Sequence, residues 1–193
     1  MAVCARILLT AILAATLAAI LAVGASQAAE APQQGDYIAH DFRFHDGQVI
    51  NELRLHYTTL GAKTGEPVLV LHGTAGTGAG MLGPDSGGQL FGPGQPLDAA
   101  KYYIVLPDSI GVGGSAKPSD GMRAEFPAYD YDDMVAAQYR LVTEGLGIRH
   151  LRLIIGNSMG GMQTCCGASS TPTRWTRWRR WPRSRPRCRA ATG

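Results

Sequence analysis

Residues 151–161 read LRLIIGNSMGG, and this stretch decides the fold. Its first five residues predict a buried β-strand, and the G-x-S-x-G pattern that follows predicts a tight turn from strand to helix. Side chains two places before and after the serine would clash there, so glycine is needed at Gly156 and Gly160, and Gly161 relaxes the helix start. We therefore predict Ser158 as an exposed nucleophile, with the Met159 N–H donating to the reacting oxygen.

The residues before this turn predict strands and a helix in the order of an α/β protein. Residues 68–71 and 102–106 are unbroken apolar runs, typical of parallel strands that are buried on both faces. Residues 130–145 carry one apolar helical face, and Gly145 and Gly147 provide the stop signal. The predicted architecture is a parallel sheet with flanking helices.

A β-hairpin is predicted to lead into this sheet. Residues 37–44 and 53–60 alternate between apolar and polar side chains, and Asp46-Gly47 between them is a strong turn signal. Leu53 and Leu55 then share one face of the second strand, and Arg54 lies on the other. Residues 29–35 before the hairpin are interpreted as a short linker.

Glycine-rich loops follow two of the predicted strands. The loop at His72-Gly73-Thr74 stands where an acyl-transfer site needs its second oxyanion donor, and His72 is given no proton-transfer role. A nucleotide site is the alternative for such loops. Residues 111–115 lack the third spaced glycine of a dinucleotide fingerprint and the lysine of a P-loop, and residues 73–80 lack Gly-Lys-Ser/Thr, so this alternative is disfavoured.

The net charge of +3 is set by the C-terminal end of the chain. Eight of the 18 Lys and Arg residues lie between Arg174 and Arg189, where there is no acid. The remaining 10 basic and 15 acidic residues give −5, so the body of the protein is mildly acidic and nucleic acid is not an expected partner.

The N-terminal residues predict an export signal at residues 1–28. Arg6 precedes an apolar run over residues 7–23, and small residues follow up to Ala28, where cleavage is expected. A retained membrane anchor is the alternative, because the run is close to the length that spans a bilayer. The expected location is periplasmic or secreted, with no membrane span after cleavage. The cysteines form neither a disulfide framework nor a metal-ligand pattern.

Several stretches resemble the homoserine O-acetyltransferase-like branch of the α/β hydrolases, from about Tyr37 to Thr164. They are LRLHY at 53–57, YDDMVAAQ at 131–138, LGI at 146–148 and IGNSMGGMQ at 155–163. The resemblance implies an incomplete α/β-hydrolase fold, with a helical cap inserted after the part seen here. It also implies Ser158 as nucleophile, the Thr74 and Met159 backbone amides as the oxyanion pair, a small-molecule ester or acyl substrate, and no cofactor or metal.

The catalytic triad of this fold runs Ser, Asp, His along the chain. All five histidines of this sequence precede Ser158, and no Asp or Glu follows it, so the chain as given is expected to be nearly inactive. Export would separate the protein from acetyl-CoA. A serine acyl hydrolase is therefore favoured over the alternative, a homoserine O-acetyltransferase.

Residues 169–193 form an Arg/Trp/Pro-rich tail that we interpret as non-native and disordered. If the gene is read one base out of frame from the codon for Cys165, it can encode a plausible amphipathic helix that is similar to the family's continuation, which indicates a frameshifted gene product. The expected partial hydrolase domain covers residues 36–168. The alternative is a non-catalytic binding protein that uses the basic tail. Missing strands would leave a sheet edge uncovered, which predicts poor solubility.

Overall fold

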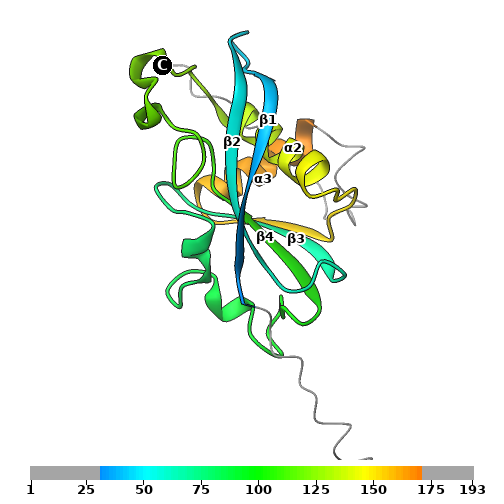
Figure 1. Cartoon of the computed structure of the whole chain (residues 1–193). Helices are drawn as coiled ribbons and strands as arrows, with labels where there is room; N and C mark the ends of the chain where they lie inside the picture. The colour runs from blue at the N-terminus through cyan, green and yellow to red at the C-terminus, as the bar shows by residue number, and fades with distance from the viewer. Residues whose placement is uncertain (1–30, 171–193) are drawn as a thin grey trace, which may run out of the picture.

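The computed structural model describes residues 31–170, which form an open, mixed five-stranded sheet with two α-helices (Figure 1). The strands are β1 (Gln33–Arg43), β2 (Val49–Leu60), β3 (Glu66–Leu71), β4 (Tyr102–Pro107) and β5 (Leu153–Gly156). Their order across the sheet is β1-β2-β4-β3-β5. Strand β2 is antiparallel to β1 and β4, whereas β4, β3 and β5 are parallel. The predicted hairpin and parallel sheet are confirmed.

The hairpin is longer than its sequence pattern indicated. Gln33 pairs with Thr59, so β1 begins within residues 29–35, and the interpretation of residues 33–35 as part of a linker is wrong. The reason is that β2 extends to Leu60 and offers its backbone to β1 along this whole length. The turn is the predicted one, with Gly47 in the left-handed region at φ 89°.

Strands β3 and β4 form the buried centre of the sheet. Val68, Ile104 and Leu106 are each fully buried, as the unbroken apolar runs predicted. Strand β5 differs from its prediction because only four residues pair and Ile155 is 38% exposed. Within the described residues β5 is the last strand of the sheet, so a neighbour covers only one of its edges.

Helix α2 (Tyr131–Arg140) begins with a reciprocal capping box. The Asp130 side chain accepts from the Asp133 N–H, and the Asp133 side chain accepts from the Asp130 N–H. The α-helix predicted over residues 130–145 ends at Arg140, and the wider π-helical turn η5 (Leu141–Gly145) follows it. This turn is closed by a bond from the Leu146 N–H to the Leu141 carbonyl. The predicted apolar face is buried throughout.

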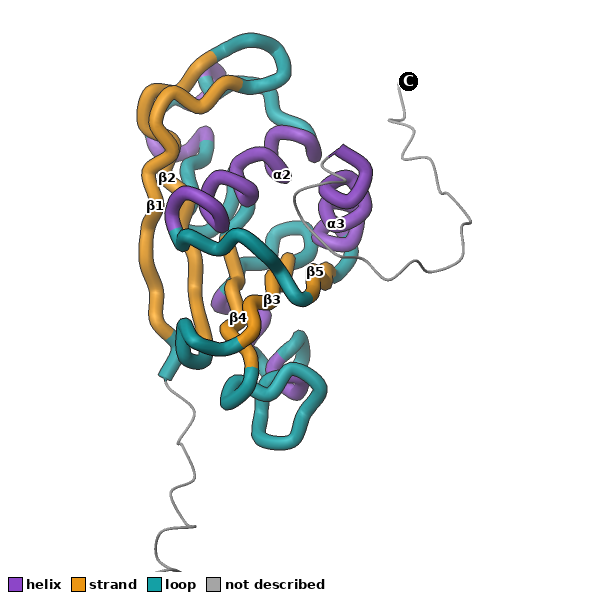
Figure 2. Tube along the Cα trace, turned by 90° about the vertical axis from the view of Figure 1, so that its right-hand side faces the viewer, coloured by secondary structure: helices purple, strands orange, loops and turns teal. Residues whose placement is uncertain are grey.

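Both α-helices lie on the same side of the sheet (Figure 2). Leu69, Leu71 and Ile154 line one small cavity together with residues of α2 and α3 (Met159–Ser170). The opposite side of β3 and β4 is covered by the segment between these strands, which contains the short helices η1 (Ala79–Leu82) and η2 (Gly88–Leu90). Two further short helices, η3 (Pro118–Asp120) and η4 (Arg123–Glu125), precede α2.

The predicted export signal at residues 1–28 lies outside the described residues, as do residues 171–193 of the predicted tail. Ser169 and Ser170, assigned to that tail from the sequence, are instead the last residues of α3. None of the helices within residues 31–170 has the length and apolar character that a bilayer crossing needs.

Candidate active site

Ser158 stands at the corner where β5 ends and α3 begins, and its side chain is exposed. Its backbone φ is 51°, in the left-handed region that serine seldom adopts. The first turn of the helix closes immediately, because the Gly160 N–H donates to the Asn157 carbonyl over 2.8 Å and the Gly161 N–H donates to Ser158 over 2.9 Å. The chain therefore reverses within a few residues and presents the hydroxyl outward.

Two glycines make this corner possible. A Cβ atom on Gly156 would lie 2.2 Å from the Gly160 carbonyl carbon, and one on Gly160 would lie 2.4 Å from the Leu71 carbonyl oxygen. These are backbone atoms that cannot move aside, which agrees with the steric argument from the sequence. Gly161 differs, since its Cβ would lie 3.4 Å from the nearest backbone atom, so this position has room for a methyl group.

The loop after β3 lies directly against the corner. A Cβ on Gly73 would be 3.4 Å from the Ser158 Cβ and 3.5 Å from the Asn157 carbonyl oxygen, so the structure brings this loop beside Ser158. Thr74 is the next residue and is exposed. Within residues 31–170 the N–H groups of Thr74 and Met159 donate to no other group, which leaves both available to an incoming oxygen.

His72 is 1% exposed, and its ring contacts both this loop and the loop after β4. Its Nε2 accepts the Ser109 backbone N–H over 3.0 Å, and its Nδ1 lies 2.7 Å from the Gly73 carbonyl oxygen. A backbone N–H can only donate and a carbonyl can only accept. The ring is therefore the neutral tautomer with the proton on Nδ1, and both nitrogens are occupied by the fold.

A buried carboxylate joins the loops that follow β3 and β4. Asp108 is 4% exposed, and its two oxygens accept the Gly78 N–H over 2.6 Å and the Gly114 N–H over 2.8 Å. Gly113 must be glycine here, because it has φ 58° and its Cβ would lie 2.0 Å from the Asp108 carboxylate. Gly114 lies in the glycine-rich stretch at residues 111–115, where a nucleotide site is disfavoured from the sequence, and its N–H donates to the protein itself.

A buried polar contact that the sequence did not predict joins α2, α3 and the loop after β4. The Gln138 side chain on α2 donates to the Gln163 Oε1 on α3 over 2.7 Å. The Gln163 Nε2 in turn lies 3.4 Å from the Ser109 Oγ, in the loop after β4. No local pattern indicates such a contact, because its partners are 25 and 54 residues apart in the chain.

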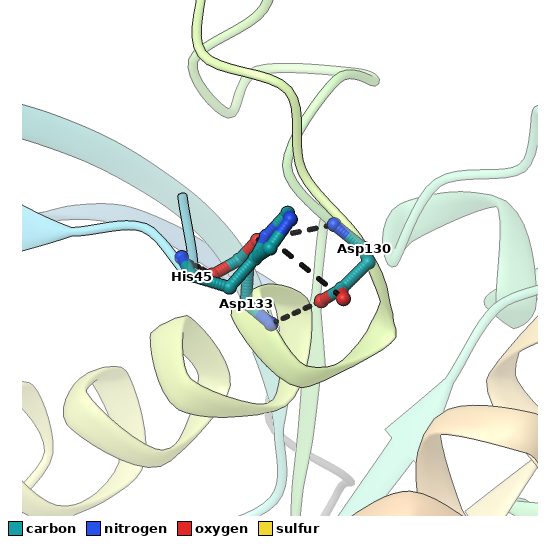
Figure 3. A group of neighbouring side chains, drawn as sticks. All are labelled: His45, Asp130 and Asp133. Carbon is teal, nitrogen blue, oxygen red and sulfur yellow. Dashed lines mark hydrogen bonds and ion pairs between the residues drawn. The ribbon is translucent and has the colours of Figure 1, made fainter. Parts of the chain in front are cut away.

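A second cluster missed from the sequence joins the hairpin turn to α2 (Figure 3). Asp133 is 3% exposed, and it accepts the His45 N–H over 2.9 Å and the His45 Nδ1 over 2.6 Å. The hydrogen bond to Asp133 raises the pKa of His45 above 6.5. Candidate ligand atoms of His45, Asp130 and Asp133 lie within 4.8 Å of one another, but these carboxylates are already used by the capping box. We name this cluster the hairpin clasp.

Comparison with known sequences finds similarity to homoserine acyltransferases. It is 34% identical over 151 residues to the homoserine O-acetyltransferase of Natronomonas pharaonis, a match that covers 68% of this chain and 37% of that protein. It is 33% identical over 167 residues to the homoserine O-succinyltransferase of Aromatoleum aromaticum, covering 77% of this chain and 44% of that protein. The chain thus spans less than half the length of these two relatives.

Comparison with solved structures gives the same fold. The acetyl esterase MekB superposes with a TM-score of 0.67 at 28% sequence identity, covering 75% of this chain and 43% of that one. A model of the alpha/beta hydrolase fold family matches residues 66–175, which is more than half of the chain and includes the corner at Ser158. The sequence pattern, the order of the strands and these matches agree, and the chain belongs to the alpha/beta hydrolase fold family.

Proposed function

We propose that this chain supplies the nucleophile and the oxyanion-binding part of a serine acyl-transfer site, and that its reaction is ester hydrolysis by an exported enzyme. One observation carries the proposal. An exposed serine stands at a left-handed corner between a strand and a helix, beside a loop that leaves a backbone N–H available next to it. We propose that the Ser158 hydroxyl and two donors, the Thr74 and Met159 N–H groups, face one common point where the reacting carbonyl binds.

The proposed reaction has two halves. The Ser158 Oγ attacks the ester carbonyl carbon, the hydroxyl proton passes to a base, and the carbonyl oxygen becomes an oxyanion facing the Thr74 and Met159 N–H groups. Collapse of this intermediate breaks the bond to the alcohol, which leaves with the proton and yields acyl-Ser158. Water then attacks the acyl group, releases the acid and restores the serine. Each oxyanion donor lowers the barrier by about 3 kcal/mol.

The base is the part of the site that this sequence does not provide after Ser158. All five histidines precede it, and His72 uses both ring nitrogens within the fold. We therefore propose that acylation of the isolated chain is slow and that it accelerates when a small base is added. Imidazole is the suitable probe, because it is the side-chain base of histidine without the tether.

Hydrolysis is preferred over acyl transfer on two grounds. MekB, one of the similar structures, is an acetyl esterase, and the proposed export signal would take the chain away from acyl-CoA. The second candidate is transfer of an acyl group to the hydroxyl of a small amino acid. It is supported by the two sequence relatives described above, a homoserine O-acetyltransferase and a homoserine O-succinyltransferase.

The test is acylation by p-nitrophenyl acetate with and without imidazole. We expect one acetyl group on Ser158 by peptide mass spectrometry, formed at least tenfold faster with imidazole. Ser158→Ala should lose the modification, whereas the exposed Ser119→Ala should keep it. An acetyl group elsewhere, or none in either condition, would overturn the proposal and favour a non-catalytic binding protein.

The same acyl-enzyme separates the two candidate functions. Isolated acetyl-Ser158 is incubated with imidazole in water alone or with added homoserine, and the released products are measured. Acetate in both cases supports hydrolysis. O-acetylhomoserine as the main product would replace hydrolysis with the transferase reaction.

A further inference from the structure

We propose that a buried chain of hydrogen bonds through Gln138, Gln163, Ser109 and His72 fixes the oxyanion loop relative to the start of α3. We name it the glutamine relay, and we assign Gln163 as a positioning residue. The inference rests on the proposed function, because the two parts that the relay joins carry the two proposed oxyanion donors. It adds a role for residues that have no contact with the substrate.

The first link joins the two helices. Gln138 is 5% exposed and Gln163 is 1% exposed, and the Gln138 Nε2 donates to the Gln163 Oε1 over 2.7 Å. Gln163 lies in the second turn of α3, shortly after Ser158. A side-chain amide buried this deeply must keep its partners, because an unpaired buried polar group is costly. The link therefore holds α3 against α2.

The second link joins α3 to the loop after β4. The Gln163 Nε2 faces two acceptors, the Ser109 Oγ at 3.4 Å and the Met134 Sδ at 3.1 Å. Ser109 is itself 3% exposed, and its Oγ has the Gln163 amide within hydrogen-bonding reach. This contact is the longest in the relay, so it is the link most sensitive to a small movement of the helix.

The last links reach the oxyanion loop. The Ser109 backbone N–H donates to the His72 Nε2 over 3.0 Å, and the His72 Nδ1 donates to the Gly73 carbonyl over 2.7 Å. Gly73 is the residue whose Cβ would touch Ser158, and Thr74 follows it. The relay thus starts on α2, passes through the helix that begins at Met159, and ends one residue before the other donor.

The glutamine relay connects the two segments that carry the proposed oxyanion donors, which the pairing of strands β3 and β5 does not reach. Pairing of β3 with β5 ends where the Asn157 N–H donates to the Leu71 carbonyl, which is before both oxyanion donors. Beyond that point the loop after β3 and helix α3 share no strand pairing, and an oxyanion is held well only when both N–H groups lie about 3 Å from it. A displacement of about 1 Å costs up to a hundredfold in rate, and such a displacement would break buried hydrogen bonds of the relay.

The test compares Gln163→Leu with Thr164→Val in the full chain. Leucine removes both hydrogen-bonding atoms of Gln163 at similar volume. Thr164 is the matched control, because its Oγ1 bonds only to the Gly160 carbonyl within α3 and lies outside the relay. The first readout is hydrogen exchange of the Ser109 amide, with the ring nitrogen signals of His72. The second is the affinity of Ser158 for methylboronic acid, which forms a tetrahedral adduct without a general base.

We expect Gln163→Leu to speed Ser109 exchange at least tenfold, to disturb the single Nδ1–H tautomer of His72, and to weaken boronate binding about tenfold. Thr164→Val should change none of these. Ser109→Ala, which removes only the hydroxyl, should act in the same direction with a smaller effect, and it serves if Gln163→Leu does not fold. Unchanged exchange and unchanged boronate affinity in a folded Gln163→Leu chain would overturn the relay. If the parent chain forms no adduct at Ser158, the proposed function fails, while the exchange of Ser109 still decides the relay.

Discussion

The two ends of the sheet are held in place by different means. At the hairpin end, apolar side chains of β1, β2 and α2 form one buried cluster, and the hairpin clasp and the Tyr37–Glu144 bond of 2.6 Å tie it to α2 and η5. At the Ser158 end, Ile155 is 38% exposed and Met162 is 53% exposed. The proposed chemistry lies at the end where close glycine contacts and a polar relay add to the apolar packing of β3 and β5.

The largest effect is expected from a methyl group at the Ser158 end. Gly160→Ala places a Cβ 2.4 Å from the Leu71 carbonyl oxygen, so β3 and α3 must separate, at a cost of about 3 kcal/mol in the free energy of unfolding. Gly161→Ala is the control, since this site has room and alanine favours a helix by about 1 kcal/mol. Urea denaturation measures both. Equal effects of the two variants would show that close backbone contact does not hold this end.

At the hairpin end, Asp133→Ala is expected to cost about 2 kcal/mol in the free energy of unfolding, because it removes the acceptor of a capping box and of His45. Asp132→Ala is the matched control, with the same charge in the same helical turn but with an exposed side chain. Urea denaturation of both variants checks this. If Asp133→Ala and Asp132→Ala lower the free energy of unfolding equally, the effect comes from negative charge at the start of the helix and not from the hairpin clasp.

A smaller effect is expected from pH. Because the pKa of His45 is raised above 6.5, its contribution to stability is fully present below that value and is lost as pH rises through the folded pKa. The difference in melting temperature between the parent chain and His45→Gln should therefore shrink as the pH rises above 6.5. A difference that stays constant with pH would rule out the titrating clasp.

The smallest effect on stability is expected at the exposed positions, where solubility should change instead. Ile155→Lys should alter the free energy of unfolding by less than about 0.5 kcal/mol but should reduce self-association, because a charge blocks pairing at a sheet edge. Val49→Lys, at a similarly exposed site of 40% in the hairpin, is the control. Light scattering against concentration measures this. An equal gain from Val49→Lys would mean that the two ends do not differ in this respect.

Local patterns in the sequence were sufficient to predict the five strands, helix α2 and the corner at Ser158, but not the bounds of these elements. Apolar runs predicted β3 and β4, and the steric rule for Gly156 and Gly160 is met by the backbone contacts of the structure. The π-helical turn at 141–145 was not predicted, because a side-chain pattern of this length does not distinguish it from the end of an α-helix. The glutamine relay and the hairpin clasp were not predictable, since their partners meet only through the fold.

The left-handed backbone at Ser158 has a consequence for engineering. A non-glycine residue in this region costs about 1 kcal/mol relative to glycine, so on folding free energy alone glycine is the preferred residue at this position. A design procedure that optimised only thermal tolerance would therefore select glycine here and delete the hydroxyl. Stability and reactivity are opposed at this residue, so a library built for heat resistance should keep position 158 fixed.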